Sequence, residues 1–261
     1  MPTEQIKQQI ANTFGNASKS YDESARLQRY SGELLLSNLP NNNDSVVLDL
    51  GCGTGYFANV LATKFNTVIG LDLSKEMLNY SKLNRNKNIN WLNADMHNIP
   101  LADNSVDIVF SNLAIQWCNP LTDAFIEIKR ILKPDGVLIF SSLLDGTLNE
   151  LKQSWLSVDN DDHVIDFNEL IDIKHSLQIS GLSITKLEKT PVVLDYDNVR
   201  HLAKELKNLG ASKVPKRSRK GLSGKNSWKK MTQAYDGYLT EQGVYPATYQ
   251  LCTGMVMNTH E

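Results

Sequence analysis

Apolar residues along this chain follow two patterns. Short continuous apolar runs alternate with longer stretches in which apolar residues recur at helical spacing. The continuous runs predict buried strands at 46–50, 67–72, 89–93, 106–111, 136–142, 182–194 and 247–257. The helically spaced stretches predict helices at 4–14, 23–38, 55–64, 74–86, 121–132, 147–157 and 167–180. Because strands and helices alternate, we expect right-handed crossovers and a mostly parallel, doubly wound sheet.

Two segments depart from this alternation. The stretch 197–243 is polar and has helical spacing, so further helices are expected there. The tetrapeptide Lys133-Pro134-Asp135-Gly136 predicts a turn between a helix and the strand that follows it.

Length and composition fit one globular α/β domain. The chain has 261 residues, of which 41% are hydrophobic and 21% are charged. No apolar run approaches membrane-spanning length, and residues 1–20 lack the apolar core of a signal peptide. We therefore expect a cytoplasmic protein that does not associate with membranes.

The three cysteines, Cys52, Cys118 and Cys252, are scattered and form no C-x-x-C pair. They indicate neither a zinc site nor a disulfide framework, which agrees with a reducing cytoplasm. No metal is expected. For Cys52, a small residue that fits a tight turn is a better interpretation than a nucleophile.

The first predicted strand ends in a cluster of glycines, which makes its end a candidate ligand site. The run 46–50 continues into Gly51-Cys52-Gly53-Thr54-Gly55, and a predicted helix follows. Glycines allow a ligand to approach the backbone, and a helix N-terminus favours a negatively charged group. The second strand ends at Asp72, whose carboxylate could bind both hydroxyls of a ribose. Together these segments predict a nucleoside-containing cofactor.

The spacing of the glycines favours one such cofactor. A dinucleotide fingerprint would need a small residue at position 56, which is Tyr56. Asp49 stands two residues before the first glycine, where its carboxylate would repel a pyrophosphate but attract an ammonium group. S-adenosylmethionine carries such an ammonium, together with a ribose diol and an adenine. On these residues the chain resembles the class I S-adenosylmethionine-dependent methyltransferases.

This resemblance implies an α/β, Rossmann-like fold with a doubly wound seven-stranded sheet, mostly parallel with an antiparallel last strand. It implies a single methyltransferase domain over 1–261. Within it we expect an N-terminal helical lid at 1–40, a core at 41–195 and 244–261, and a helical cap insertion at 196–243.

Further cofactor contacts are expected where other strands end, because open α/β sheets bind ligands at their carboxyl edge. Asp95 could accept a hydrogen bond from the adenine amino group, with Met96 against the ring; the alternative for Asp95 is a solvated loop acid. Leu73 and Met77 fit core positions better than adenine contacts, although Leu73 could be both. The expected cofactor-binding residues are Asp49, Gly51, Cys52, Gly53, Gly55, Asp72, Leu73, Met77, Asp95, Met96 and Asn112.

Less generic segments carry a narrower resemblance, to the malonyl-acyl-carrier-protein O-methyltransferases of the biotin pathway. These segments span almost the whole chain and comprise Phe14, Tyr21, Leu27-Gln28-Arg29, 111–118, 206–211 and 245–249. The chain departs from that family at Thr54, where relatives can carry proline. The resemblance implies methyl transfer to the free carboxylate of a malonyl thioester. A carboxylate is ionised at neutral pH, so no residue is expected to act as a general base.

The same resemblance implies that the N-terminal helices form a lid in which Tyr21 faces the cofactor and the malonyl end. A cation should hold the malonyl carboxylate, and Lys207 or Arg29 could serve. The expected substrate-binding residues are Tyr21, Arg29, Asn112, Gln116, Trp117 and Lys207. The simpler alternatives are that Tyr21 is a buried structural tyrosine, that Trp117 only covers the core, and that Lys207 is an exposed surface lysine.

Charge is distributed unevenly along the chain. The segment from Lys204 to Lys230 holds ten basic residues and one acid, whereas the whole chain has 27 basic and 29 acidic residues. A basic segment on an acidic body suits docking of an acidic partner, and the family resemblance implies an acyl-carrier protein. A solvated basic loop is the alternative. Nucleic acid ranks lower as a partner, because only Trp228 in the segment could stack on bases.

Two classes of function remain open at this point. One is a carboxyl methyltransferase, for malonyl-acyl-carrier protein or for another small acid. The other is a non-catalytic S-adenosylmethionine-binding protein that docks a partner through the basic segment. Only the first predicts turnover, and the complete set of cofactor motifs favours it.

Overall fold

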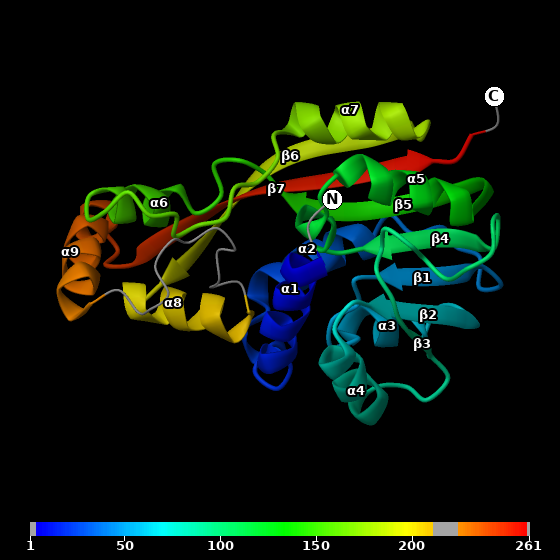
Figure 1. The fold of residues 1–261 in the computed structure, drawn as a ribbon, viewed down its shortest axis with the longest axis horizontal. Helices are drawn as coiled ribbons and strands as arrows, with labels where there is room; N and C mark the ends of the chain where they lie inside the picture. The colour runs from blue at the N-terminus through cyan, green and yellow to red at the C-terminus, as the bar shows by residue number, and fades with distance from the viewer. Residues whose placement is uncertain (1–3, 211–223, 260–261) are drawn as a thin grey trace.

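In the described part of the chain, seven strands form one sheet in the order β3-β2-β1-β4-β5-β7-β6 (Figure 1). The computed structural model describes residues 4–210 and 224–259. β1 to β5 run parallel to one another, whereas β7 is antiparallel to both β5 and β6. The predicted doubly wound sheet with an antiparallel last strand is therefore confirmed. The strands are β1 (Val46–Leu50), β2 (Thr67–Asp72), β3 (Asn90–Asn93), β4 (Val106–Ser111), β5 (Leu132–Leu143), β6 (Ser183–Tyr196) and β7 (Tyr245–Met257).

The helices lie close to the predicted ranges, although the predicted helix at 23–38 is divided into a 3-10 turn and α2. Short 3-10 helices occur at Asp22–Ser24, Ile115–Trp117 and Asp236–Tyr238. The α-helices are α1 (Glu4–Ala17), α2 (Arg26–Leu36), α3 (Tyr56–Leu61), α4 (Lys75–Asn84), α5 (Leu121–Ile131), α6 (Asn149–Leu156), α7 (Leu170–Ser180), α8 (Val199–Asn208) and α9 (Lys225–Tyr235).

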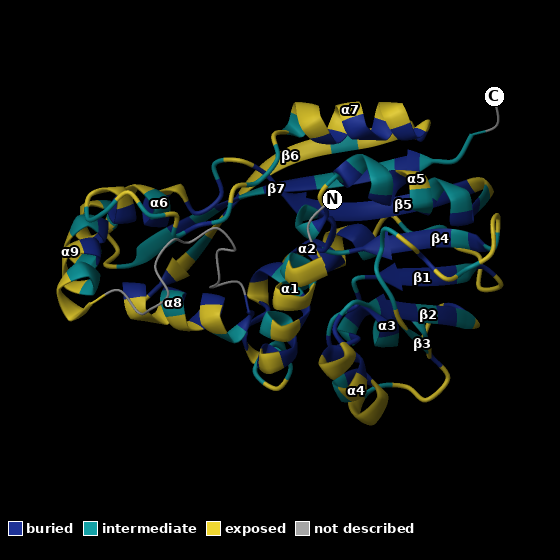
Figure 2. Cartoon of the chain, in the orientation of Figure 1, coloured by how far each residue is buried: buried dark blue, intermediate teal, exposed yellow. Residues whose placement is uncertain are grey.

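Alternate side chains of the central strands pack into separate cores on the two faces of the sheet. On β4, Ile108 and Phe110 pack in a cluster with residues of α2 and α3. Val109 packs on the opposite face in a cluster with residues of α5 and α7. The central strands β1, β4 and β5 are buried along most of their length, whereas β6 at the edge of the sheet is largely exposed (Figure 2). Because helices cover both faces of the sheet, the central strands are apolar at nearly every position.

The prediction that a turn at 133–136 separates a helix from the following strand is wrong. β5 already begins at Leu132, which pairs with Val106, while Ile108 pairs with Val137. The intervening residues form an irregularity within the strand, in which Asp135 has a φ of 61°. The proline, aspartate and glycine therefore allow the strand to bulge rather than end it.

β6 and β7 extend beyond the parallel strands and carry a second structural unit. α6, α8 and α9 gather around the far end of this strand pair (Figure 1). Their apolar side chains form one cluster with both strands, in which Leu206 of α8 and Met231 of α9 join Tyr249 of β7. The polar stretch 197–243 thus contains the expected helices, although residues 211–223 lie outside the described part of the chain.

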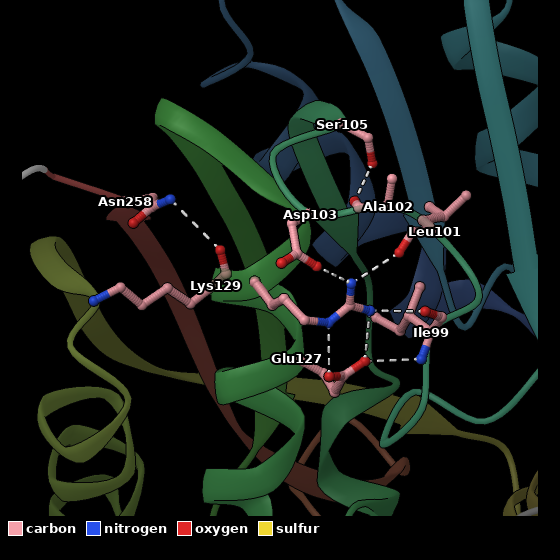
Figure 3. A network of polar contacts seen from close by, with 9 residues as sticks. Ile99, Leu101, Ala102, Asp103, Ser105, Glu127, Lys129 and Asn258 are labelled. Atoms are coloured by element: carbon pink, nitrogen blue, oxygen red, sulfur yellow. Dashed lines mark hydrogen bonds and ion pairs between the residues drawn. The ribbon is translucent and has the colours of Figure 1, made fainter.

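An arginine network fixes the loop that leads from β3 to β4 (Figure 3). The guanidinium of Arg130, on α5, donates to the carboxylates of Glu127 and Asp103 and to the carbonyl oxygens of Leu101 and Ile99, at 2.7–2.9 Å. The Glu127 carboxylate also accepts the backbone N–H of Ile99 at 3.0 Å. The loop that carries Asp95 is therefore held at its far end by charge-assisted hydrogen bonds.

A close contact between α2 and α3 gives a test of this packing. A Cβ at Gly32 would lie 2.0 Å from the ring of Phe57, which itself packs against Phe110. Gly32→Ala should therefore lower the free energy of unfolding by about 1–3 kcal/mol, the usual cost of overpacking. In an unobstructed helix the same change would raise it by up to about 1 kcal/mol.

Urea denaturation would measure this change. Gly237→Ala is a matched control, because no heavy atom lies within 4 Å of the position of its Cβ. A Gly32→Ala protein as stable as the wild type would show that α2 does not pack tightly on α3.

Candidate functional site

The loop from β1 to α3 crosses the end of β2. The backbone N–H groups of Gly51 and Cys52 donate to the carbonyl oxygen of Leu71 at 2.8 and 2.9 Å. Gly51 and Gly53 have φ values of 76° and 54°. A Cβ at Gly51 would lie 2.3 Å from the Cβ of Ala114, whereas no heavy atom lies within 4 Å of the Cβ position at Gly53. Gly51 is thus needed for packing, and Gly53 faces open space that a ligand can use.

Asp49 is a buried carboxylate at the end of β1. Its side-chain oxygen Oδ2 is buried without a hydrogen-bond partner. Burial, and to a lesser degree the charge of Asp72, raises the pKa of Asp49 to about 8 despite a hydrogen bond from the Ala58 backbone. A positively charged group beside Asp49 would satisfy this oxygen and restore the ionised form.

Asp72 accepts two backbone hydrogen bonds at the end of β2. Its Oδ2 accepts the N–H of Gly53 at 2.8 Å, and its Oδ1 accepts the N–H of Ser74 at 2.7 Å. Burial raises the pKa of Asp72, and these two bonds oppose the rise. Each oxygen keeps a free lone pair, so the fixed carboxylate can still accept two hydroxyl groups.

Asp95, after β3, is bound by groups that the sequence analysis did not identify. Its carboxylate forms an ion pair with Lys7 of α1 and accepts hydrogen bonds from the backbone N–H and Nδ1 of His97. Burial raises the pKa of Asp95, but the hydrogen bonds from His97 and Lys7 outweigh it and hold the pKa below its usual value. Lys7 gave no signal in the sequence beyond its place in an amphipathic helix.

These strand ends surround a cavity, which we call the strand-end cavity. α1 forms its opposite wall, with Lys7 and Phe14. Of the expected cofactor-binding residues, those lining it are Gly51, Gly53, Asp72, Leu73, Met77, Asp95, Met96 and Asn112. Asp49 and Cys52 line a smaller cavity beside it, and Gly55 lines neither. Burial raises the pKa of the Cys52 thiol, which fits its interpretation as a turn residue.

The N-terminal helices are fastened across this site. The ring of Phe14 contacts Trp117 edge to face, with centroids 5.2 Å apart. The carboxylate of Asp22 accepts the hydroxyl of Thr54 at 2.6 Å and pairs with Arg85. Thr54, the residue that departs from the family pattern, therefore ties the glycine loop to the N-terminal segment.

Tyr21 lines the strand-end cavity, the smaller cavity and a further cavity, which is bordered by α2, α6, α8 and α9. Burial, followed by the charges of Asp72 and Asp22, raises the pKa of its hydroxyl, while a hydrogen bond with Gln28 opposes this. The hydroxyl therefore stays protonated at neutral pH and acts as a hydrogen-bond donor.

Arg29 and Asn112 both line the smaller cavity but are already engaged by the protein. The guanidinium of Arg29 lies 4.2 Å from the ring centroid of Tyr56 and donates to the carbonyl oxygen of Asp22 at 2.8 Å. The side-chain oxygen of Asn112 accepts from Ser31 at 2.6 Å and Ser141 at 2.8 Å. The Asn112 amide also donates to the Gln28 carbonyl oxygen at 2.8 Å, so it links α2 to β4 and β5.

A second cavity adjoins the strand-end cavity. The two share Phe14, Tyr21, Leu113 and Trp117, which we call the junction. From there the second cavity is bordered by α2, α6, α8 and α9, with Gln28, Gln116, Trp155, Leu206 and Trp228 among its lining residues. Lys207 is exposed on α8 and lines none of these cavities, so the structure does not bring it to the other expected substrate residues.

The described part of the basic segment lies on α8 and α9. Lys204, Lys207, Lys225, Lys229 and Lys230 are all exposed. The other five basic residues of the segment fall between 213 and 220, outside the described residues. Within 4–210 and 224–259, no helix is long and apolar enough to cross a membrane. The same residues contain no cluster of His, Cys, Asp or Glu that could hold a metal.

Comparison with known proteins identifies the family. Residues 48–140 match the methyltransferase domain family. The chain is 38% identical over 253 residues to malonyl-[acyl-carrier protein] O-methyltransferase of Pectobacterium atrosepticum, covering 96% of each chain. It is 37% identical over 246 residues to the biotin biosynthesis bifunctional protein BioHC of Cellvibrio japonicus, covering 94% of this chain but only 49%, about half, of that relative.

The fold is also shared with a solved structure. An S-adenosylmethionine-dependent methyltransferase from Mesorhizobium loti superposes with a TM-score of 0.53 at 15% identity, covering 86% of this chain and 96% of that one. Given the identity to full-length relatives, the chain belongs to the family of malonyl-[acyl-carrier protein] O-methyltransferases and is an S-adenosylmethionine-dependent O-methyltransferase, as the resemblance predicted.

Proposed function

We propose that this enzyme methylates the free carboxylate of malonyl-acyl-carrier protein, giving its methyl ester for biotin synthesis. The observation that carries the proposal is the chemistry of the junction. Its four residues, Phe14, Tyr21, Leu113 and Trp117, include no group that could remove a proton at neutral pH. An alcohol or an ammonium would need a base before it could attack a methyl group, whereas a carboxylate is already ionised.

The residues around the strand-end cavity fit S-adenosylmethionine. The partnerless oxygen of Asp49 suits the α-ammonium, and the open space at Gly53 admits the ligand next to the backbone. Asp72 would bind the ribose hydroxyls, while Asp95 and Met96 would border the adenine. When bound, this cofactor supplies an electrophilic methyl group on a sulfonium.

The chain's own contribution to the reaction is to bind, orient and desolvate the nucleophile. The protonated hydroxyl of Tyr21 can donate to one carboxylate oxygen and leave the other free to attack. The rings of Phe14 and Trp117 exclude water, which would otherwise solvate the carboxylate and weaken it as a nucleophile. Arg29 stays the candidate cation, because it borders the smaller cavity beside Tyr21.

A direct assay tests the proposed function. The purified enzyme is incubated with S-adenosylmethionine and malonyl-acyl-carrier protein, and the methyl ester is detected by mass spectrometry. Malonyl-coenzyme A and trans-aconitate serve as comparators. Methylation of trans-aconitate alone would indicate another small acid as substrate. Cofactor binding with no methylated product would indicate the non-catalytic alternative.

Asp72→Asn should weaken binding of S-adenosylmethionine by about ten- to hundredfold. Loss of a charged acceptor for buried hydroxyls costs about 1.5–3 kcal/mol. Titration calorimetry would measure the change, with Asp44→Asn as a control, because Asp44 is exposed and lies just before β1, at the opposite edge of the sheet from Asp72. Unchanged affinity in a folded Asp72→Asn protein would contradict the ribose assignment.

Binding of the product S-adenosylhomocysteine at pH 6.5 should release up to about one proton. Asp49, whose pKa is about 8, is mostly protonated in the free protein at this pH, and a bound ammonium would ionise it. The release should fall to about half near pH 8 and disappear well above it, where Asp49 is already ionised in the free protein. Calorimetry in buffers of different ionisation enthalpy measures the number of protons. Equal release from Asp49→Asn would rule out Asp49 as the source.

The exposed lysines of α9 should contribute to docking of the acidic carrier. Changing Lys225, Lys229 and Lys230 together to Glu should lower kcat/KM for malonyl-acyl-carrier protein by about tenfold or more at low salt, through a slower association rate. The difference should shrink at high salt because of screening. Methylation of malonyl-pantetheine, which lacks the acidic carrier protein and its phosphate, should change little.

The matched control for this variant reverses three exposed lysines elsewhere, namely Lys64, Lys82 and Lys87. They belong to the region of α3 and α4, at the opposite end of the protein from α9 (Figure 1). If both triple variants reduced activity on the carrier protein equally, overall charge rather than docking at α9 would explain the effect.

A further inference from the structure

We propose that the second cavity is the route of the carrier's pantetheine arm, which enters near α6 and α9 and presents the malonyl group at the junction. This inference rests on the proposed function and assigns the path by which that substrate reaches the cofactor. The second cavity meets the strand-end cavity at Tyr21 and Trp117, which line both. Trp155, His163 and Trp228 line only the second cavity, so it leads away from the cofactor residues toward α6 and α9.

The walls of this cavity are unsuited to a malonyl group alone. The cavity has a volume of about 220 Å³, and its walls are mostly leucine, valine and aromatic side chains. Malonyl is short and polar, so an apolar passage of this kind would bring it no favourable contacts. The methylene segments of a longer arm would be buried there.

Two amide side chains indicate that the occupant also carries N–H groups. Gln28 and Gln116 both line the second cavity, and the side-chain oxygen of each is buried without a hydrogen-bond partner. Buried acceptors without donors are uncommon in folded proteins. A pantetheine arm alternates methylene segments with two amide N–H groups and can supply donors, whereas a hydrocarbon chain has none.

Ring stacking and a hydrogen bond fix the side chains at the end of the cavity near α6 and α9. The imidazole of His163 stacks on the indole of Trp155, with centroids 3.7 Å apart and planes 2° from parallel. Nε2 of His163 lies 2.8 Å from a carboxylate oxygen of Asp159. The Trp155 ring also lies 6.4 Å from the ring of Trp228, so α6 and α9 meet at an aromatic wall.

Two of the helices that border this cavity, α8 and α9, carry exposed positive charge. Lys204 and Lys207 on α8 are exposed, and so are Lys225, Lys229 and Lys230 on α9. The arm is joined to its carrier through a phosphate, and acyl-carrier proteins are acidic. The charge around the cavity is therefore complementary to the two groups that stay outside when the arm is inserted.

α8 provides a position at which the passage can be blocked away from the junction. Its C-terminal residue Asn208 contacts the segment next to Tyr21, through a 3.2 Å bond from Ser20 and a 3.1 Å bond to Ser24. Ala203 lines the same cavity five residues earlier, which is about 7–8 Å along the helix. A large side chain at Ala203 would thus narrow the passage without reaching Tyr21.

The experiment compares two malonyl thioesters of different length in the Ala203→Trp enzyme. Malonyl-pantetheine must occupy the whole passage, whereas malonyl-N-acetylcysteamine is truncated and needs only the inner part. We expect kcat/KM for malonyl-pantetheine and malonyl-acyl-carrier protein to fall at least tenfold, while the value for the truncated thioester stays within twofold. His201→Trp, at an exposed position of α8 outside the cavity, keeps the arginine and lysines of α8; it is the control and should leave all three values unchanged.

Retained binding of S-adenosylhomocysteine verifies that the variant is folded. Equal loss on the long and the truncated thioester, or no loss on either, would overturn the proposed route. A second measurement does not depend on turnover or on the variant. Wild-type enzyme should bind acyl-carrier protein that carries its pantetheine arm at least tenfold more tightly than the same protein without it, and should do so with quenching of tryptophan fluorescence.

Equal affinity for the two forms of the carrier protein would also overturn the route. Failure of the proposed function has a different signature. In that case the wild-type enzyme would methylate none of the three malonyl thioesters, whichever form of the carrier protein it bound.

Discussion

The reversal of strand order between β1 and β4 is the constraint on which the site depends. The helices after these neighbouring strands pack on opposite faces, with α3 in one core and α5 in the other. The chain segments that leave the two strands therefore diverge and leave a crevice above the strand ends. They diverge from a close contact, because Gly51 after β1 has no room for a Cβ beside Ala114 after β4. Most of the expected cofactor-binding residues line the strand-end cavity at this crevice.

Side-chain atoms that are buried without partners concentrate at the cavities. Within the described residues there are three such atoms, on Asp49, Gln28 and Gln116. Each of these residues lines the smaller or the second cavity. Folded proteins satisfy nearly all their buried polar groups, so a donor on a bound ligand would complete the hydrogen bonding at these surfaces. The proposed ammonium and amide contacts both rest on this pattern.

The sequence predicted the features that depend on local patterns. The strands, the glycine loop and Asp72 could be recognised because apolar runs and short spacings carry their signal. Contacts across long separations could not be recognised in this way. The Lys7–Asp95 pair joins residues 88 positions apart, and the bond between Thr54 and Asp22 joins the glycine loop to a different helix. Lys207 was singled out by its sequence context, but the rotation of α8 leaves it in solvent.

The long strand β6 lies at the edge of the sheet, and an unprotected edge invites a strand from another molecule to pair with it. Charged side chains follow one another along this edge at Lys186, Glu188 and Lys189, and Pro191 has no N–H to donate. The pairing register also shifts between Ile184 and Lys186. These features all oppose strand addition where β6 covers the β7 residues that pair with β5, so the edge of the sheet is protected from self-aggregation along that length.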